Sequence, residues 1–322
     1  MAQQPSDKNK QASKNASRPV GQGAKRTAPS KASKRSSSTL LTWGAIGLVL
    51  VIVVVLLVVK FAGGGSTTTS GTGSSVAPQS LVDQVTKIPA SVYDTVGVTS
   101  PATPVSKPVE VKGQPALTFP DASGAAKPGV LYIGAEYCPY CAAERWPMIA
   151  ALSRFGSFAN LSVTQSSATD VYPNTPTFSF FKASATSSYL VFKGVEQYSN
   201  VADASGGYKV LEQLTPAQVK LISKYDTAKY LPGASPGSIP FISIGNRFLV
   251  AGASYSPAIL SGLTRSEIAA GLSDPTNPAT QAIVSTANYL TASICQITNQ
   301  QPGSVCTSKG VQAANKSMGL SS

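Results

Sequence analysis

The chain of 322 residues contains no histidine, and this absence excludes several classes of active site. A catalytic serine or cysteine cannot be paired with an imidazole base, and no zinc site can use an imidazole ligand. Charged side chains are also scarce, at 12% of residues, which is low for a soluble cytosolic protein. The chain does have four cysteines, and disulfides persist mainly outside the cytoplasm. These features favour an extracytoplasmic protein whose most reactive side chains are thiols.

Positive charge is concentrated at the N-terminus. Residues 1–39 hold nine of the 26 Lys and Arg residues but a single acid, Asp7, so the rest of the chain is nearly balanced in charge. Ser, Lys, Ala and Gln dominate this segment, a composition that favours disorder. It has no aromatic side chain to stack on bases. We therefore expect a disordered basic cytoplasmic tail and no nucleic-acid partner, with the cations attracted to anionic lipid headgroups by ~1 kcal/mol each.

Residues 40–60 are expected to form one transmembrane helix. The run 40–59 carries no charge and is closed by Lys60; at ~1.5 Å per residue it spans ~30 Å, the thickness of the hydrocarbon core. The preceding cations predict a cytoplasmic N-terminus and an extracytoplasmic C-terminal domain. A cleaved signal peptide is the alternative, but the long basic region and the length of the apolar run favour an uncleaved anchor in the cell membrane. Residues 61–78, rich in Gly, Ser and Thr, are expected to be a flexible linker.

The motif Cys138-Pro139-Tyr140-Cys141 lies between two expected elements. Apolar residues 130–135 predict a buried strand, and residues 139 to about 155 predict a helix. The first cysteine then lies at the positive end of a helix, where a thiolate is favoured and the sulfur is nucleophilic toward disulfides. The second, one turn later, is close enough to resolve a mixed disulfide. The motif therefore predicts thiol-disulfide exchange, with an inert disulfide or half of a metal site as the alternatives.

The remaining pattern predicts an α/β domain over residues 79–322. An amphipathic helix begins near Ser80, and residues 109–111 and 116–119 predict a short hairpin. Residues 161–165 predict the strand that follows the active-site helix. Later elements are expected as follows: a helix from Thr215, strands at 239–244 and 247–251, and helices at about 264–273 and 277–297.

The segment around the motif resembles the thioredoxin superfamily. Ala135-Glu136-Tyr137-Cys138 is similar to the Ala-Glu-Trp-Cys of thioredoxins, Pro139-Tyr140 is the dipeptide typical of glutaredoxins, and Ile239-Pro240 looks like the family's cis-proline. More closely, residues 134–146 and the anchored layout resemble an uncharacterised family of membrane-anchored thioredoxin-like proteins of archaea and actinobacteria, a domain of unknown function.

This resemblance implies a thioredoxin-like mixed sheet flanked by helices. The long segment between residue 165 and Pro240 implies an inserted lobe, at about residues 166–237, as in the disulfide oxidoreductases of the bacterial periplasm. Cys138 is the expected nucleophile and Cys141 the resolving cysteine. Neither an organic cofactor nor a metal is implied.

The resemblance also implies roles near the two cysteines. Pro240 is expected to place the backbone of Ile239 against the sulfurs, where Ile239 and Tyr140 would contact the substrate; an ordinary edge-strand proline is the alternative. Thioredoxins carry a buried Asp six residues before the first cysteine, where this chain has Tyr132. Glu136 or Glu144 is the candidate to replace it, and we include Glu136 among the expected catalytic residues.

Cys295 and Cys306 form a second pair. Residues 301–304 can turn the chain back after the last long helix, which favours a structural disulfide. A second redox pair that exchanges with the first, and a zinc site of four thiolates, are the alternatives; the spacing is wide for a zinc knuckle.

Together these features predict a membrane-anchored thiol-disulfide oxidoreductase or isomerase. Its expected partners are thiols or disulfides of exported proteins and an unidentified redox partner protein. The alternative is a non-enzymatic extracytoplasmic binding module in which both cysteine pairs are structural disulfides. The direction of exchange is not predicted.

Overall fold

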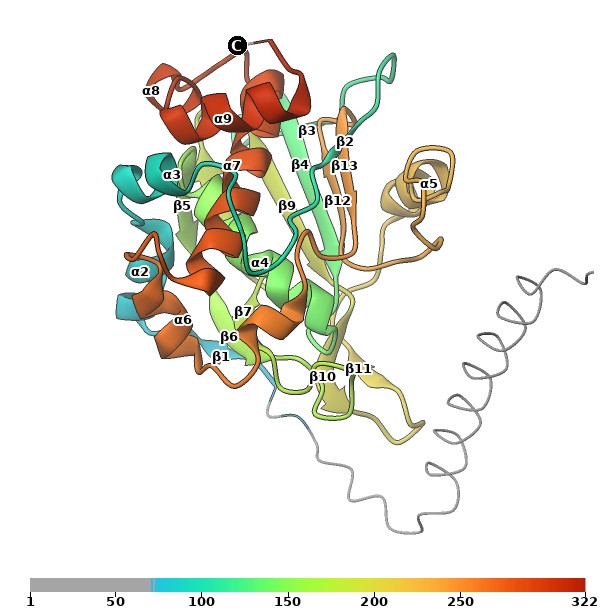
Figure 1. Cartoon of the computed structure of the whole chain (residues 1–322). Helices are drawn as coiled ribbons and strands as arrows, with labels where there is room; N and C mark the ends of the chain where they lie inside the picture. Colours follow the sequence, from blue (N-terminus) through green and yellow to red (C-terminus); the bar gives the residue numbers. More distant parts are fainter. Residues whose placement is uncertain (1–70, 72, 322) are drawn as a thin grey trace, which may run out of the picture. The chain divides into compact units, whose positions relative to one another are not determined.

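The computed structural model describes residue 71 and residues 73–321. The expected basic tail, the expected transmembrane helix and most of the expected linker therefore lie outside the described residues. Within the part of the chain that is described, no helix is long and apolar enough to cross a membrane. The described residues form a mixed α/β structure with a mixed sheet flanked by helices (Figure 1).

The central sheet is built around β4 (Ala126–Gly134). On one edge β4 pairs antiparallel with β12 (Phe241–Ile244), which pairs antiparallel with β13 (Phe248–Ala251). Residues 129–134 of β4 also pair in parallel with β9 (Val191–Glu196). Two short strands complete the sheet: β2 (Val109–Glu110) beside β13, and β3 (Thr118–Pro120) beside the start of β4. The order β9-β4-β12-β13 thus contains one parallel and two antiparallel neighbours.

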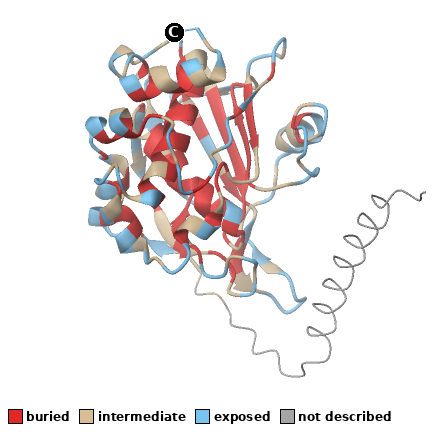
Figure 2. Cartoon of the chain, viewed as in Figure 1, coloured by how far each residue is buried: buried red, intermediate tan, exposed pale blue. Residues whose placement is uncertain are grey.

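Both faces of this sheet are covered, because successive side chains of a strand point to opposite faces. Val130 and Tyr132 pack among the helices α4 (Pro139–Leu152) and α7 (Pro278–Ile297), while Leu131 and Ile133 pack beside α5 (Pro216–Tyr225). Figure 1 shows α4 and α7 on one side of the sheet and α5 on the other. Buried residues are concentrated in the central strands and the helices next to them (Figure 2). The apolar sequence 130–135 is therefore a doubly covered strand, as its lack of alternation predicts.

The predicted helices are present with small differences at their ends. The amphipathic segment near Ser80 forms α2 (Gln79–Thr86) and is followed by α3 (Ala90–Val96). Thr215 caps α5, and α6 (Arg265–Gly271) and α7 match the last two predicted helices. Besides α3, three further helical elements were not expected: η1 (Pro257–Leu260), α8 (Gly303–Cys306) and α9 (Lys309–Met318).

One prediction about strand pairing is wrong. Residues 109–111 and 116–119 do not form a hairpin with each other, because β2 pairs with β13 and β3 pairs with β4. The segment 166–237, expected as an insertion, supplies β9, the parallel neighbour of β4. The strand expected to follow the active-site helix, β6 (Ser162–Gln165), instead belongs to a separate small sheet.

That small sheet has the order β1-β6-β7, with β1 at Ser75–Val76 and β7 at Pro176–Ser179. Because β1 pairs with β6, the last residues of the expected linker are part of the folded domain. Two further antiparallel pairs form separate two-stranded sheets: β5 (Gly156–Ala159) with β8 (Ser184–Ser187), and β10 (Tyr198–Ala202) with β11 (Tyr208–Val210).

Candidate functional site

The two cysteines of the motif lie at the N-terminus of α4 as free thiols. Cys138 is the N-cap residue of this helix, and Pro139 occupies its first turn, where a proline needs no hydrogen-bond partner. The sulfur of Cys138 accepts a hydrogen bond from the backbone nitrogen of Cys141, at 3.2 Å. Only 5% of the surface of Cys138 is exposed, and Cys141 is completely buried. At this helix terminus, Cys138 is therefore slightly exposed to solvent and Cys141 is not exposed at all.

The surroundings of the two thiols shift their pKa values in opposite directions. A hydrogen bond with the Cys141 thiol, backbone N–H groups and the charge of Arg145 lower the pKa of Cys138, although burial opposes them. Burial raises the pKa of Cys141 well above the ordinary value of a thiol, and its interaction with Cys138 adds to the effect. Since the thiolate is the reactive form, this arrangement favours Cys138 as the nucleophile and keeps Cys141 protonated until a reaction begins.

The segment before β12 lies against Cys138. The Ile239–Pro240 peptide bond is cis, and the thiol of Cys138 donates to the carbonyl oxygen of Ile239 at 3.7 Å. The neighbouring residue, Phe241, is opposite Ile133 in the pairing of β12 with β4. The structure therefore brings both predicted residues, Ile239 and Pro240, to the predicted nucleophile.

Tyrosines gather beside the motif. Tyr140 is 40% exposed and meets Tyr172 edge-on, with ring centroids 5.9 Å apart. Tyr137 is stacked on Tyr208 at 4.3 Å, and Tyr198 lies at 6.3 Å from it. Burial raises the pKa of Tyr137 to about 12, so its hydroxyl stays neutral near pH 7. Tyr140 is thus the most exposed residue of the motif.

The two carboxylates that are candidates to replace the missing Asp, Glu136 and Glu144, are both buried. Glu136 is buried, which raises its pKa, while the Ser179 hydroxyl lowers it to a smaller extent. Glu144 accepts hydrogen bonds from the backbone nitrogen and the hydroxyl of Ser254. Within the described residues neither carboxylate forms a hydrogen bond with Cys141.

A buried ion pair that the sequence analysis missed lies next to the motif. The Nε and Nη2 atoms of Arg145 are 2.8 and 2.7 Å from the two oxygens of Glu196, and both side chains are completely buried. Arg145 Nη2 also donates to the carbonyl oxygen of Ala135 at 2.7 Å. A partial signal was present, because Arg145 is the only Lys or Arg in residues 130–152 and Glu196 directly follows the apolar Val195.

The comparison with protein families gives one match. The family described as Domain of unknown function (DUF929) matches residues 120–296, which is more than half of the chain. The chain belongs to this family. No curated protein and no solved structure matches it. The DUF929 match spans Cys138, Cys141, the Ile239–Pro240 bond and the Arg145–Glu196 pair.

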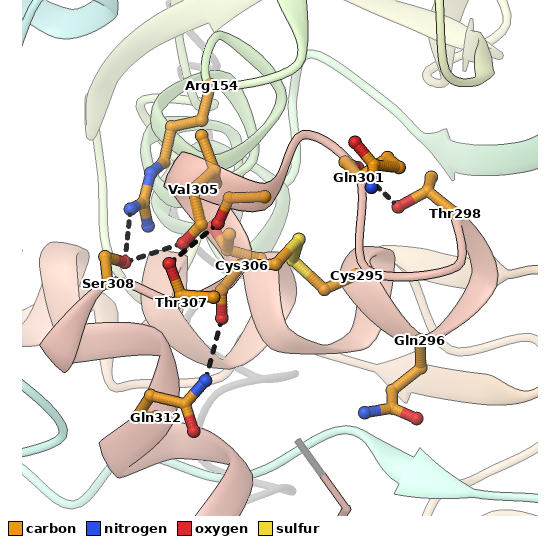
Figure 3. The surroundings of a disulfide bond; sticks show 12 residues. Arg154, Cys295, Gln296, Thr298, Gln301, Val305, Cys306, Thr307, Ser308 and Gln312 are labelled. Carbon is orange, nitrogen blue, oxygen red and sulfur yellow. Dashed lines mark hydrogen bonds between the residues drawn. A yellow bond between two sulfur atoms is a disulfide. The ribbon is translucent and has the colours of Figure 1, made fainter.

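The second cysteine pair lies across the end of the DUF929 match, with Cys295 inside it and Cys306 beyond it. Cys295 in α7 and Cys306 in α8 form a disulfide, with Cα atoms 5.7 Å apart and both residues completely buried (Figure 3). Gln312 donates to the carbonyl oxygen of Cys306 at 2.9 Å, and Arg154 donates to Ser308 Oγ at 2.9 Å. The bond thus connects the last long helix to the C-terminal helices. Among the described residues, no three Cys, Asp or Glu side chains are grouped as a metal site would require.

Proposed function

We propose that this DUF929 protein is a thiol-disulfide oxidoreductase or isomerase that acts on exported proteins. The observation that carries the proposal is the asymmetry of the two thiols. Cys138 has a lowered pKa at a helix N-terminus beside the Ile239 carbonyl, whereas Cys141 is fully buried with a raised pKa. An attacking and a resolving thiol need this difference, because only the first must be a thiolate before substrate arrives.

The architecture supports a thioredoxin-like fold for the domain. The motif joins the central strand β4 to the helix α4, and a strand introduced by a cis-proline lies antiparallel to β4. The mixed order β9-β4-β12-β13 and the helices on both faces agree with the mixed, helix-flanked sheet that the resemblance to thioredoxins implies.

The proposed reaction has two steps. In the direction of substrate reduction, the Cys138 thiolate attacks a substrate disulfide; a mixed disulfide forms, and one substrate sulfur leaves as a thiolate that takes up a proton. Cys141 then loses its proton and attacks Cys138, the mixed disulfide breaks, and the second substrate sulfur leaves. The substrate gains two electrons and two protons, and Cys138–Cys141 becomes a disulfide. A redox partner protein reverses this last change; substrate oxidation follows the same steps backward.

The membrane placement is part of the proposal and rests on the sequence. The apolar run 40–59, with cations before it, would anchor the domain with its N-terminus in the cytoplasm. A short linker would then keep the thiols near the outer surface of the membrane, where exported chains emerge.

The proposal is tested by the redox equilibrium of the full chain in detergent. The protein is equilibrated with mixtures of reduced and oxidised glutathione, its thiols are trapped, and each cysteine is assigned by mass analysis. We expect Cys138–Cys141 to equilibrate between about −120 and −270 mV, the range of known exchange catalysts. If that pair instead resists reduction below about −300 mV, as structural disulfides do, the protein is a binding module with two structural disulfides.

A further inference from the structure

Arg145 and Glu196 form the only ion pair among the described residues in which both side chains are completely buried. Removing two charges from water is costly, and the pair persists only because its hydrogen bonds are numerous. Besides the two bonds between the side chains, Glu196 Oε1 accepts from the backbone nitrogen of Phe180 at 3.2 Å. Arg145 Nη2 donates to the Ala135 carbonyl at 2.7 Å. Replacing such a pair by apolar residues is often neutral for stability, so stability alone does not explain why two charged side chains are buried here.

The ion pair is connected to the reactive thiols through the backbone. The carbonyl oxygen of Ala135, to which Arg145 donates, also accepts the backbone N–H of Cys138 at 3.3 Å. The guanidinium therefore holds the turn that presents the nucleophile. Arg145 also follows Cys141 by four residues on α4, so the two side chains share one face of this helix.

The ion pair is also connected to the thiols by charge. The positive charge of Arg145 lowers the pKa of both Cys138 and Cys141. Glu196 raises the pKa of Cys141, but its effect is smaller than that of Arg145. In a buried site these interactions are weakly screened by salt.

We propose that Arg145 and Glu196 are positioning residues that set the redox potential of the Cys138–Cys141 pair. This inference rests on the proposed function. Arg145 favours the thiolate and hence the reduced form of the pair, and Glu196 both orients the guanidinium and moderates its charge. In the equilibrium with glutathione, two glutathione thiols become one glutathione disulfide. Their two electrons break the Cys138–Cys141 bond. Of the two protons that they release, one goes to Cys141, and the other goes to Cys138 or, where Cys138 remains a thiolate, to water.

The first test uses Glu196→Gln in the full chain, because glutamine keeps the shape of the side chain and removes its charge. Without the negative charge, Arg145 stabilises the thiolate more strongly. We expect the equilibrium with glutathione to move toward the reduced pair by about tenfold, equivalent to ~30 mV for this two-electron couple. The pH profile of Cys138 alkylation should move to lower pH in parallel. Glu110→Gln is the matched control, since Glu110 pairs with Arg247 in a partly exposed ion pair, at 3.1 Å. It should leave both measurements unchanged.

The second test uses the double change Arg145→Met and Glu196→Met, which replaces the pair by apolar side chains and is the variant expected to fold most easily. Here the dominant positive charge is lost, so the equilibrium should move in the opposite direction, toward the disulfide. A structural role alone would not produce shifts of opposite sign. If either folded variant has the potential and alkylation profile of the unmodified chain, the inference is wrong. If the unmodified chain does not equilibrate with glutathione at all, the proposed function itself fails.

Discussion

The sulfur of Cys138 lies 3.7 Å from the carbonyl oxygen of Ile239, although the two residues are 101 positions apart in the chain. The contact arises because β12 pairs with β4, which ends immediately before the cysteine motif. Only 5% of the Cys138 surface is exposed, so a reagent must approach the sulfur close to this carbonyl. The cis-proline segment thus forms one wall of the candidate site.

The first prediction concerns the selectivity of alkylation. We expect iodoacetamide to modify Cys138 and to leave Cys141 unmodified in the folded, reduced protein. The pKa of Cys138 is lowered by the Cys141 thiol and backbone N–H groups, whereas Cys141 is completely buried with a raised pKa. The rate at Cys138 should reach half of its plateau at a pH below about 8.5, the ordinary pKa of cysteine. Mass analysis of peptides across a pH series checks this.

Two variants control this experiment. Cys141→Ala removes the side-chain donor that hydrogen-bonds Cys138, so the midpoint of the profile should move to higher pH. Cys138→Ser leaves only the buried thiol, and modification should then require unfolding. Fast labelling of Cys141 in the folded Cys138→Ser protein would contradict the assignment of roles.

Local sequence signals were sufficient to predict most of the longer helices and the central strands. Thr215 and Pro216 mark the start of α5, since the threonine accepts from Gln218 and the proline needs no partner. The strand at 130–135 and the helix after Cys138 were equally clear. This strand and this helix alone place the candidate nucleophile, Cys138, at a helix N-terminus.

Pairing between distant segments was not predictable from these signals. Residues 161–165 and 191–196 are both short segments that mix apolar and polar side chains, and nothing local distinguishes the strand that pairs with β4 from the one that does not. The glycine turn at Lys112-Gly113 suggested a hairpin, but the flanking strands pair with β13 and β4 instead. The Arg145–Glu196 pair could not be predicted for the same reason. Glu196 ends β9, so its position beside α4 follows only once β9 is placed next to β4.

The second prediction concerns the Cys295–Cys306 disulfide. Replacing both residues by alanine should lower the free energy of unfolding by about 2–3 kcal/mol, because the short loop between them is no longer closed in the unfolded chain. Denaturant titration under oxidising conditions checks this. The alkylation profile of Cys138 should remain unchanged, since the disulfide lies at the junction of α7 and α8. A changed profile would favour exchange between the two pairs.

The third prediction compares two buried tyrosines. Within the described residues, the hydroxyl of Tyr132 has no hydrogen-bond partner, while that of Tyr93 donates to the Ala150 carbonyl at 3.0 Å. An unpaired buried hydroxyl costs roughly 1–3 kcal/mol. Tyr132→Phe should therefore raise the free energy of unfolding by about 1 kcal/mol, and its ring keeps the edge-on contact with Phe180. Tyr93→Phe, the matched control, should lower it by about 1 kcal/mol. Denaturant titrations of the two variants side by side measure both effects, and equal changes would contradict the hydrogen-bond argument.

The fourth prediction concerns the pH dependence of stability and depends on Glu144. Burial raises the pKa of this carboxyl from 4.5 to about 7, although the backbone and side chain of Ser254 lower it in part. The folded state therefore binds a proton more tightly than the unfolded state. The resulting stabilisation is complete below pH 4.5 and is lost as the pH rises through about 7. Over this window Glu144 alone should reduce the free energy of unfolding by on the order of 3 kcal/mol.

Glu144→Gln tests this directly, because the amide has the shape of the protonated carboxyl and does not titrate. We measure the free energy of unfolding of both proteins by denaturant titration. As the pH is raised from about 4.5 to 8, the variant should become more stable relative to the unmodified protein. Ser254→Ala removes the hydroxyl bonded to Glu144 Oε1 at 3.0 Å, so the carboxyl should be still harder to ionise. The loss of stability should still begin near pH 4.5, but it should continue to a higher pH and be larger in total. If the variant and the unmodified protein lose stability in parallel, Glu144 is already ionised at low pH. The two hydrogen bonds from Ser254 then outweigh the burial of this carboxylate.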